Sequence, residues 1–303
     1  MALYHILSMD GGGIRGIMTA ILLQRLEESR PGFLSYIQLF AGTSTGGLLA
    51  LGLASGKTPA EMRKLYQESG EKVFADTVSD DVRDFVMLVG ADYSLGPLKM
   101  TLSEQFDEHR LDALPKKVLV SSFDLDNEDP VHSKRTWKAK FFHNYPGLDS
   151  DGDQKVVDVA LRTANAPLFF PIYQGYIDGG VVANNPSVCA LAQALNPQTG
   201  AQKLDDLVLL SVGTGYNPRY LSSQDGDWGL VQWAPHLLYL VLEGDTELAD
   251  YQCRQLLGKR YLRLNIQLPT TIGMDRVDQL PLLEKLAMQF DLTPALAWLD
   301  NYF

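Results

Sequence analysis

Ser44 lies at the centre of a glycine-rich stretch whose residue types could build a nucleophilic site. The stretch is Gly42-Thr43-Ser44-Thr45-Gly46-Gly47, between an apolar run over 36–41 and a helix-like run over 48–54. A strand, a tight turn and a helix in this order form a nucleophile elbow, whose serine is strained and needs small neighbours. Gly42 and Gly46 meet that need, and the helix start favours developing negative charge. The alternative is an ordinary turn without chemistry.

A second glycine loop follows the strand-like residues 5–9, with the sequence Asp10-Gly11-Gly12-Gly13-Ile14-Arg15-Gly16. Consecutive backbone N–H groups in such a loop can point at one anion. The spacing fits a dinucleotide fingerprint, but that fingerprint needs an acidic residue where the second strand ends. The second strand runs instead into Thr43 and Ser44, and the glycine loop is not followed by the Gly-Lys-Ser/Thr of a phosphate-binding loop. The pattern therefore favours an oxyanion hole opposite Ser44, because neighbouring parallel strands bring both loops to one carboxyl edge.

Asp178 is a candidate base, since Asp178-Gly179-Gly180 follows a strand-like segment over 175–177. The alternative is a simple hairpin turn, for which Asp-Gly is a common sequence. An aspartate with the ordinary pKa of about 4 is a poor base for a hydroxyl group. An apolar, desolvated setting raises that pKa. Nearby apolar residues could supply the setting or be plain core: Phe169, Phe170, Ile172 and Tyr176.

His236 is the residue that a serine–acid–histidine triad would require, because it alone among the histidines follows Asp178 in the chain. It lies at the expected start of a helix rather than in a loop after a strand. This context favours a surface or capping residue. A Ser44–Asp178 dyad and a triad completed by His236 both stay open on the residues alone.

The composition is that of a globular protein, with 46% apolar and 21% charged residues among 303. The net charge of -11 argues against a nucleic-acid partner and against electrostatic docking on an anionic membrane. Cys189 and Cys253 make no disulfide framework. No signal-peptide pattern and no apolar run of about 18 residues is present, so we expect a cytoplasmic protein.

Strand-like and helix-like segments alternate along the chain, which indicates an α/β fold. The expected strands are 5–9, 36–41, 117–123, 137–142, 175–177, 207–212 and 261–265. The expected helices include 58–73, 103–114, 155–164 and a helix that ends at 195. Without a repeat or linker, residues 1–303 are expected to form one domain, with the helix-rich part 228–303 packed on the rest.

Three segments have two interpretations each. Residues 85–89, in an irregular stretch over 74–100, are either core or part of a cover over an apolar pocket. The acidic residues between 124 and 129 do not match a calcium loop and favour a solvated hairpin turn. The apolar residues between 237 and 242 are expected to pack against the sheet, and transient membrane contact by apolar insertion is the alternative.

The segments 10–16, 42–47 and 178–180, in that order, resemble the signature of the patatin-like phospholipases. Supporting likeness is found at 164–171, 183–186 and 211–215, and the resemblance extends from about residue 5 to about 290, with the signature region at about 5–215. The resemblance implies a three-layer α/β fold. Its mainly parallel central sheet would have helices on both faces and a Ser–Asp dyad at the carboxyl edge.

The resemblance also implies a lipid acyl hydrolase of phospholipase A or lysophospholipase type that is calcium-independent and needs no cofactor. Ser44 matches the family nucleophile and Asp178 the family acid. The positions that match the oxyanion and substrate-binding loop are Gly11, Gly12, Gly13 and Arg15, and we add the backbone N–H of Thr45. The implied partner is a membrane or micellar lipid: a phospholipid, a lysophospholipid or a galactolipid. The family also contains storage proteins and toxins, so a regulated or largely non-catalytic protein is a second hypothesis.

Overall fold

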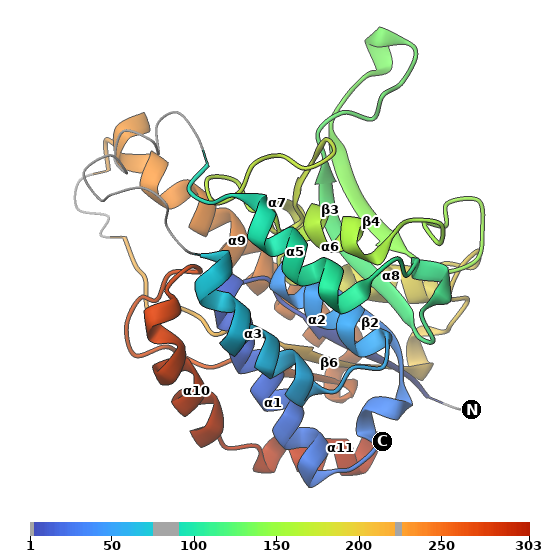
Figure 1. Cartoon of the computed structure of the whole chain (residues 1–303). Helices are drawn as coiled ribbons and strands as arrows, with labels where there is room; N and C mark the ends of the chain where they lie inside the picture. The colour runs from blue at the N-terminus through green and yellow to red at the C-terminus, as the bar shows by residue number, and fades with distance from the viewer. Residues whose placement is uncertain (1–2, 75–90, 222–225) are drawn as a thin grey trace.

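The computed structural model describes residues 3–74, 91–221 and 226–303 (Figure 1). Within these ranges seven strands form one sheet in the order β4-β3-β2-β1-β6-β7, with β5 paired to β3. The strands are β1 (Tyr4–Met9), β2 (Ile37–Thr43), β3 (Lys117–Asp124), β4 (Lys138–His143), β5 (Tyr176–Asp178), β6 (Leu207–Val212) and β7 (Tyr261–Leu264).

The centre of the sheet is parallel, and its antiparallel strands lie on one side. β1 pairs in parallel with both β2 and β6, whereas β4 and β5 run antiparallel to β3. Met9 at the end of β1 is in register with Gly42 of β2. The loops that follow these two strands therefore begin side by side, which confirms that the two glycine loops meet at one edge of the sheet.

Helices cover both faces of the sheet, as the α/β expectation requires. They are α1 (Gly16–Ser29), α2 (Thr45–Ala54), α3 (Pro59–Val73), α5 (Leu95–Phe106), α6 (Val156–Ala164), α7 (Gly180–Ala183), α8 (Ser187–Leu195), α9 (Leu230–Leu257), α10 (Leu280–Gln289) and α11 (Thr293–Tyr302). Along β1, Leu7 and Met9 belong to the core beneath α1, α2 and α6, while Ile6 belongs to the core beneath α8 and the end of α9. This alternation follows from the two-residue period of a strand and produces three layers.

The helix expected at 103–114 is wrong, because α5 spans Leu95–Phe106 and ends where Asp107 adopts a φ of 49°. Gly96 and Pro97 made its beginning look irregular. They lie in the first turn of the helix, where a missing N–H costs no hydrogen bond. Residues 85–89 lie outside the described residues. The acidic residues after Asp124 belong to the connection between antiparallel β3 and β4, as predicted.

Candidate active site

Ser44 occupies the turn between β2 and α2, with a φ of 53° and a ψ of −125°. A Cβ atom at Gly42 would lie 2.0 Å from the carbonyl oxygen of Gly46. A Cβ atom at Gly46 would lie 2.2 Å from the carbonyl oxygen of Met9. Neither distance is tolerable, so both positions need glycine. The prediction of a strained serine between two obligatory small residues is confirmed.

Thr163 of α6 holds the backbone of Ser44 in this conformation. Its Oγ1 atom accepts a hydrogen bond from the amide nitrogen of Ser44 at 2.8 Å and donates one to the carbonyl oxygen of Ser121 at 2.6 Å. Thr163 is fully buried, and Ser121 belongs to β3 beside the elbow. The threonine therefore connects Ser44 to the sheet. Sequence analysis missed Thr163, because its helix meets the elbow only in the folded chain.

Asp178 is buried at the end of β5 and faces the elbow. The Ser44 hydroxyl lies close to its carboxylate, in a cavity that both residues line. The amide nitrogen of Gly180 donates a hydrogen bond to Asp178 Oδ1 at 2.7 Å. Burial raises the pKa of Asp178 to about 6, against the opposing effect of the Ser44 hydroxyl and the Gly180 amide. The carboxylate is thus a better proton acceptor than an exposed aspartate, while it stays largely ionised at neutral pH.

Close packing on β3 brings Asp178 to this position. Asp178 pairs with Ser122, whose Oγ atom donates to the carbonyl oxygens of Ile177 and Arg162 at 2.9 Å each. A Cβ atom at Gly179 would lie 2.4 Å from the backbone of Ser121. The glycine after the acid is therefore what allows β5 to approach β3.

The glycine loop after β1 lies against Ser44, and its three glycines are not equivalent. The amide of Gly11 donates to the carbonyl oxygen of Asn184 at 3.0 Å, so that N–H is already engaged. Among the backbone hydrogen bonds of turns, loops and helix caps in the described residues, none has the amide of Gly12 or Gly13 as donor. Thr45 is the first residue of α2, where the amide has no acceptor within the helix. Gly12, Gly13 and Thr45 thus offer three backbone donors around Ser44.

Two contacts fix the shape of this loop. Thr214 Oγ1 donates to the carbonyl oxygen of Gly11 at 2.7 Å, and the amide of Ile14 donates to the carbonyl oxygen of Met274 at 2.7 Å. Gly12 has a φ of 159° and Gly13 a φ of 58°, and a Cβ atom at Gly13 would lie 2.2 Å from the Met274 oxygen. The loop is therefore held from both sides before any ligand binds.

A buried ion pair anchors the loop where it leaves β1. Arg263 of β7 donates to both carboxylate oxygens of Asp10 and, at 2.7 Å, to Ser211 Oγ. The Arg263 and Asp10 side chains are 6% and 3% exposed. Sequence analysis missed Arg263, although an arginine within an otherwise apolar strand is a signal that a buried partner is needed.

Arg15 lines a different cavity from those that contain Ser44. Its Nε atom is 3.4 Å from the carbonyl oxygen of Gly12, and its side chain lines a polar cavity with Thr214, Asn265 and Glu243. Burial lowers the pKa of Arg15 to about 10, while the neighbouring Glu243 acts in the opposite direction. Among the described residues, no carboxylate is within ion-pair distance of the guanidinium. Arg15 is therefore a buried cation that faces a cavity of its own.

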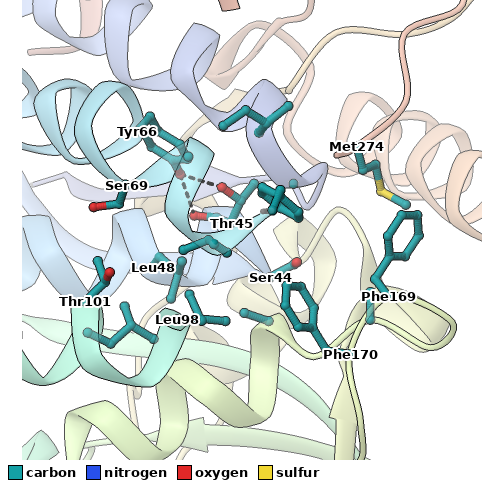
Figure 2. A pocket seen from close by; sticks show the side chains of 18 of the residues that line it. Ser44, Thr45, Leu48, Tyr66, Ser69, Leu98, Thr101, Phe169, Phe170 and Met274 are labelled. Atoms are coloured by element: carbon teal, nitrogen blue, oxygen red, sulfur yellow. Dashed lines mark hydrogen bonds between the residues drawn. The ribbon is translucent and has the colours of Figure 1, made fainter. Parts of the chain in front are cut away.

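Ser44 opens into an apolar cavity between α2, α3 and α5. Figure 2 shows Ser44 beside Phe169 and Phe170, with Ser69 and Thr101 at the other end of the cavity. The remaining wall is largely aliphatic and includes Leu48, Leu65, Val73, Leu98 and Leu102. The Tyr66 hydroxyl is hydrogen-bonded to the Thr45 side chain at the start of α2. An apolar cavity that reaches a serine suits a hydrocarbon chain attached to the reacting group.

The described residues that line the two cavities containing Ser44 do not include His236. His236 lies near the start of α9, and its ring is stacked on Trp228 with the ring centres 5.8 Å apart. The second cavity combines Ser44 and Asp178 with Gly12, Pro167, Leu238 and Leu242. The geometry thus pairs the serine with the aspartate and leaves the histidine outside the site.

Comparison with known proteins gives a family model, "Patatin-like phospholipase", that matches residues 7–188. The chain is 34% identical over 274 residues to a protein from Pseudomonas aeruginosa named cGAMP-activated phospholipase, covering 86% of this chain and 78% of that protein. It is 28% identical to the putative sporulation hydrolase CotR of Bacillus subtilis, covering 99% of this chain and 98% of CotR.

The solved structures that the chain matches include VipD from Legionella pneumophila, with a TM-score of 0.44 and 12% identity over all of this chain and 67% of VipD. Human GIVD cytosolic phospholipase A2 matches with a TM-score of 0.40 and 10% identity, over 99% of this chain and 63% of the human chain. The family model covers more than half of the chain and spans both glycine loops and Asp178. The chain belongs to the patatin-like phospholipase family.

Proposed function

We propose that this chain is a calcium-independent lipid acyl hydrolase that works through a Ser44 acyl-enzyme with Asp178 as general base. One observation supports the proposal above all others. The strained Ser44 lies beside a buried carboxylate with a raised pKa, at the mouth of an apolar cavity. The proposed nucleophile and base thus line one cavity, as covalent catalysis requires.

In the first step, Ser44 Oγ attacks the ester carbonyl carbon and Asp178 accepts the hydroxyl proton. The carbonyl oxygen becomes an oxyanion, which the amides of Gly12, Gly13 and Thr45 stabilise together with the positive end of α2. One such donor typically contributes about 10²–10³-fold to kcat. The C–O bond to the alcohol then breaks, and Asp178 returns its proton to the leaving oxygen.

In the second step, water attacks the acyl group on Ser44 while Asp178 takes one of the water protons. The bond between the acyl carbon and Ser44 Oγ breaks, and the serine recovers a proton from Asp178. The products are a free fatty acid and an alcohol. The same residue therefore acts as base and acid in both halves of the reaction.

The acyl chain of the substrate is proposed to occupy the apolar cavity between α3 and α5. Its wall offers aliphatic side chains to a hydrocarbon, and Phe169 and Phe170 flank the entrance beside Ser44. The substrate class is a phospholipid, lysophospholipid or galactolipid, in which such a chain is joined through an ester.

The test is acyl release from a short-chain nitrophenyl ester and from phosphatidylcholine, with EDTA present throughout. Wild type should hydrolyse both, and Ser44→Ala and Asp178→Asn should each lose at least about 10³-fold in kcat. His236→Ala is the matched control and should keep wild-type rates. Activity that survives in Asp178→Asn, or is lost in His236→Ala, would contradict the dyad.

A second candidate function is a hydrolase switched on by an anionic ligand. The relative from Pseudomonas aeruginosa is named for activation by cGAMP. The buried guanidinium of Arg15 faces the polar cavity behind the oxyanion loop. Glu243 and Glu247 also line this cavity, but in the described part of the chain no carboxylate is within ion-pair distance of Arg15. A phosphate bound there would contact Gly11 and Asn184. The backbone hydrogen bond between these two residues helps to fix the shape of the glycine loop.

Adding cGAMP to the purified protein tests this candidate. Under this hypothesis the rate on phosphatidylcholine rises at least about tenfold with cGAMP and not with the same concentration of inorganic phosphate. Thr246→Ala, at the wall of the polar cavity, should weaken the response. Equal rates with and without cGAMP would remove the candidate and leave the unregulated enzyme.

A further inference from the structure

The amino-terminal part of α9 exposes apolar side chains that the described part of the chain leaves uncovered. From Leu230 to Leu242 the helix contains no Asp, Glu, Lys or Arg. Leu237, Leu240 and Val241 are each 47% exposed. Their expected packing against the sheet is therefore wrong. α9 contributes to the core through its other end, where Cys253 and Leu257 are buried, and its first turns extend beyond the sheet (Figure 1).

The same turns of α9 border the catalytic cavity. Leu238 and Leu242 line the cavity that contains Ser44 and Asp178. In the sequence they directly follow the exposed Leu237 and Val241. One side of this helical segment thus faces the reacting groups. The other side carries the exposed apolar surface, without a charged residue between them.

A second segment adds apolar surface at the same entrance. Ala166 and Pro167 line the same cavity as Leu238 and Leu242, and the next residue, Leu168, is 57% exposed. Exposed apolar residues from two separate segments therefore adjoin one cavity, which differs from the scattered single residues of an ordinary surface.

We propose that these residues form an apolar rim, made of Leu168, Leu237, Leu240 and Val241, that inserts into a zwitterionic lipid surface. The proposal rests on the proposed function, because insertion would bring the entrance of the Ser44 cavity to the level of the lipid esters. Trp233, on the same turns, suits the boundary between head groups and acyl chains.

Charge decides which lipid surface fits. The chain has a net charge of -11, and residues 230–242 contain no cation of their own, although the Arg219 guanidinium lies over the Tyr239 ring of this segment. Anionic lipids therefore repel the molecule, whereas a zwitterionic surface lets apolar burial act unopposed. Among the described helices, none combines the length and apolar character needed to cross a bilayer. The contact we infer is thus shallow and at the interface.

The binding experiment uses Ser44→Ala protein, so that the lipid is not consumed, and phosphatidylcholine vesicles in a flotation assay. We expect binding, with a blue shift of tryptophan emission that Trp233→Phe reduces. Leu237→Gln, Leu240→Gln and Val241→Gln together should weaken binding at least about tenfold. The matched control changes three exposed apolar residues elsewhere to glutamine, Leu148, Leu256 and Met288, and should bind within about twofold of the parent.

The activity experiment uses the same three rim substitutions with Ser44 intact. We expect wild-type rates on a monomeric short-chain ester and at least about tenfold lower rates on phosphatidylcholine vesicles, because the substitutions avoid the cavity-lining Leu238 and Leu242. Vesicle binding that is unchanged in the triple glutamine variant would overturn the proposal. Stronger binding of the parent protein to phosphatidylserine vesicles than to phosphatidylcholine vesicles would also overturn it.

Sedimentation of the rim variant separates lipid from a second copy of the chain. A concentration-dependent dimer that the three substitutions abolish, with vesicle binding unaltered, would reassign the surface to self-association and overturn the proposal. Vesicle binding that depends on the rim, in a protein that hydrolyses neither ester, would support the rim while the proposed function fails. The two failures are thus distinguishable.

Discussion

Asp178 combines two properties at the end of β5 that a general base needs. Burial raises its pKa to about 6, while the hydrogen bond from the Gly180 amide and the nearby Ser44 hydroxyl favour the ionised carboxylate. A base acts only when deprotonated. On a soluble ester, kcat/KM should therefore fall tenfold for each pH unit below about 6 and level off above it. A midpoint near 4 in the pH profile would show that Asp178 keeps the pKa of an exposed acid.

The same pKa predicts a stability effect that does not depend on activity. A carboxyl whose pKa is raised from 3.8 to about 6 on folding favours the folded state when protonated. That contribution is present at low pH and lost as pH rises through about 6. Asp178→Asn, which is neutral at every pH, should therefore raise the free energy of unfolding by about 3 kcal/mol at pH 8.

Urea unfolding of Asp178→Asn and wild type at pH 8 and at pH 4 measures this effect. The difference should nearly vanish at pH 4, where the wild-type carboxyl is largely protonated in the folded state. Asp205→Asn, at an exposed position, serves as the control and should change little at either pH. A destabilised Asp178→Asn at pH 8 would mean that the ionised carboxylate is favoured by folding.

Thr163 is proposed to be a positioning residue for Ser44. Thr163→Val keeps the shape but leaves the Ser44 amide without its acceptor, which costs about 1–3 kcal/mol for a buried group. If this free energy displaces Ser44 from its reactive position, kcat should decrease about 10–100-fold. KM should be unchanged, because Thr163 does not line the described walls of the two Ser44 cavities. Thr163→Ser restores the hydroxyl and should restore kcat. Equal kinetics of the Val and Ser variants would limit Thr163 to packing.

The elbow as an element depends on the close approach of α2 to the end of β1. Gly46→Ala places a Cβ atom 2.2 Å from the Met9 oxygen and 2.6 Å from the Asp10 oxygen. The helix must shift, which separates Ser44 from the oxyanion loop, so activity should fall at least about 100-fold. Gly244→Ala in α9 is the matched control. Its Cβ meets open space, and it should keep full activity and gain about 0.5–1 kcal/mol of stability.

Elements whose signal is local could be predicted from the sequence. The elbow and the glycine loop each combine a strand, glycines and a helix within a few residues. Thr163 and Arg263 had no such signal, because their partners Ser44 and Asp10 lie 119 and 253 positions away. The rim segment of α9 was misjudged for another reason. An apolar helix face looks alike in sequence whether it packs on a sheet or projects past the end of that sheet.

The first and last parts of the chain meet across the whole molecule. β7 joins the sheet through β6, α10 packs on α1, and His5 Nε2 is 2.7 Å from the carbonyl oxygen of Tyr302. The family model ends at residue 188, yet these contacts involve residues far beyond it. We therefore propose that residues 1–303 fold as one domain, in which the helix-rich part is needed to support the oxyanion loop.

The buried pair between Asp10 and Arg263 offers the sharpest test of that unity. Arg263→Met removes the cation and leaves the Asp10 carboxylate buried without its partner, which should cost about 3–5 kcal/mol. If the chain is one cooperative unit, unfolding followed by backbone circular dichroism and by tryptophan fluorescence shifts together, as a single transition. Adding Asp10→Asn should recover much of the loss, because no unpaired charge remains. Two separate transitions, of which only one responds to Arg263→Met, would divide the chain into independent domains.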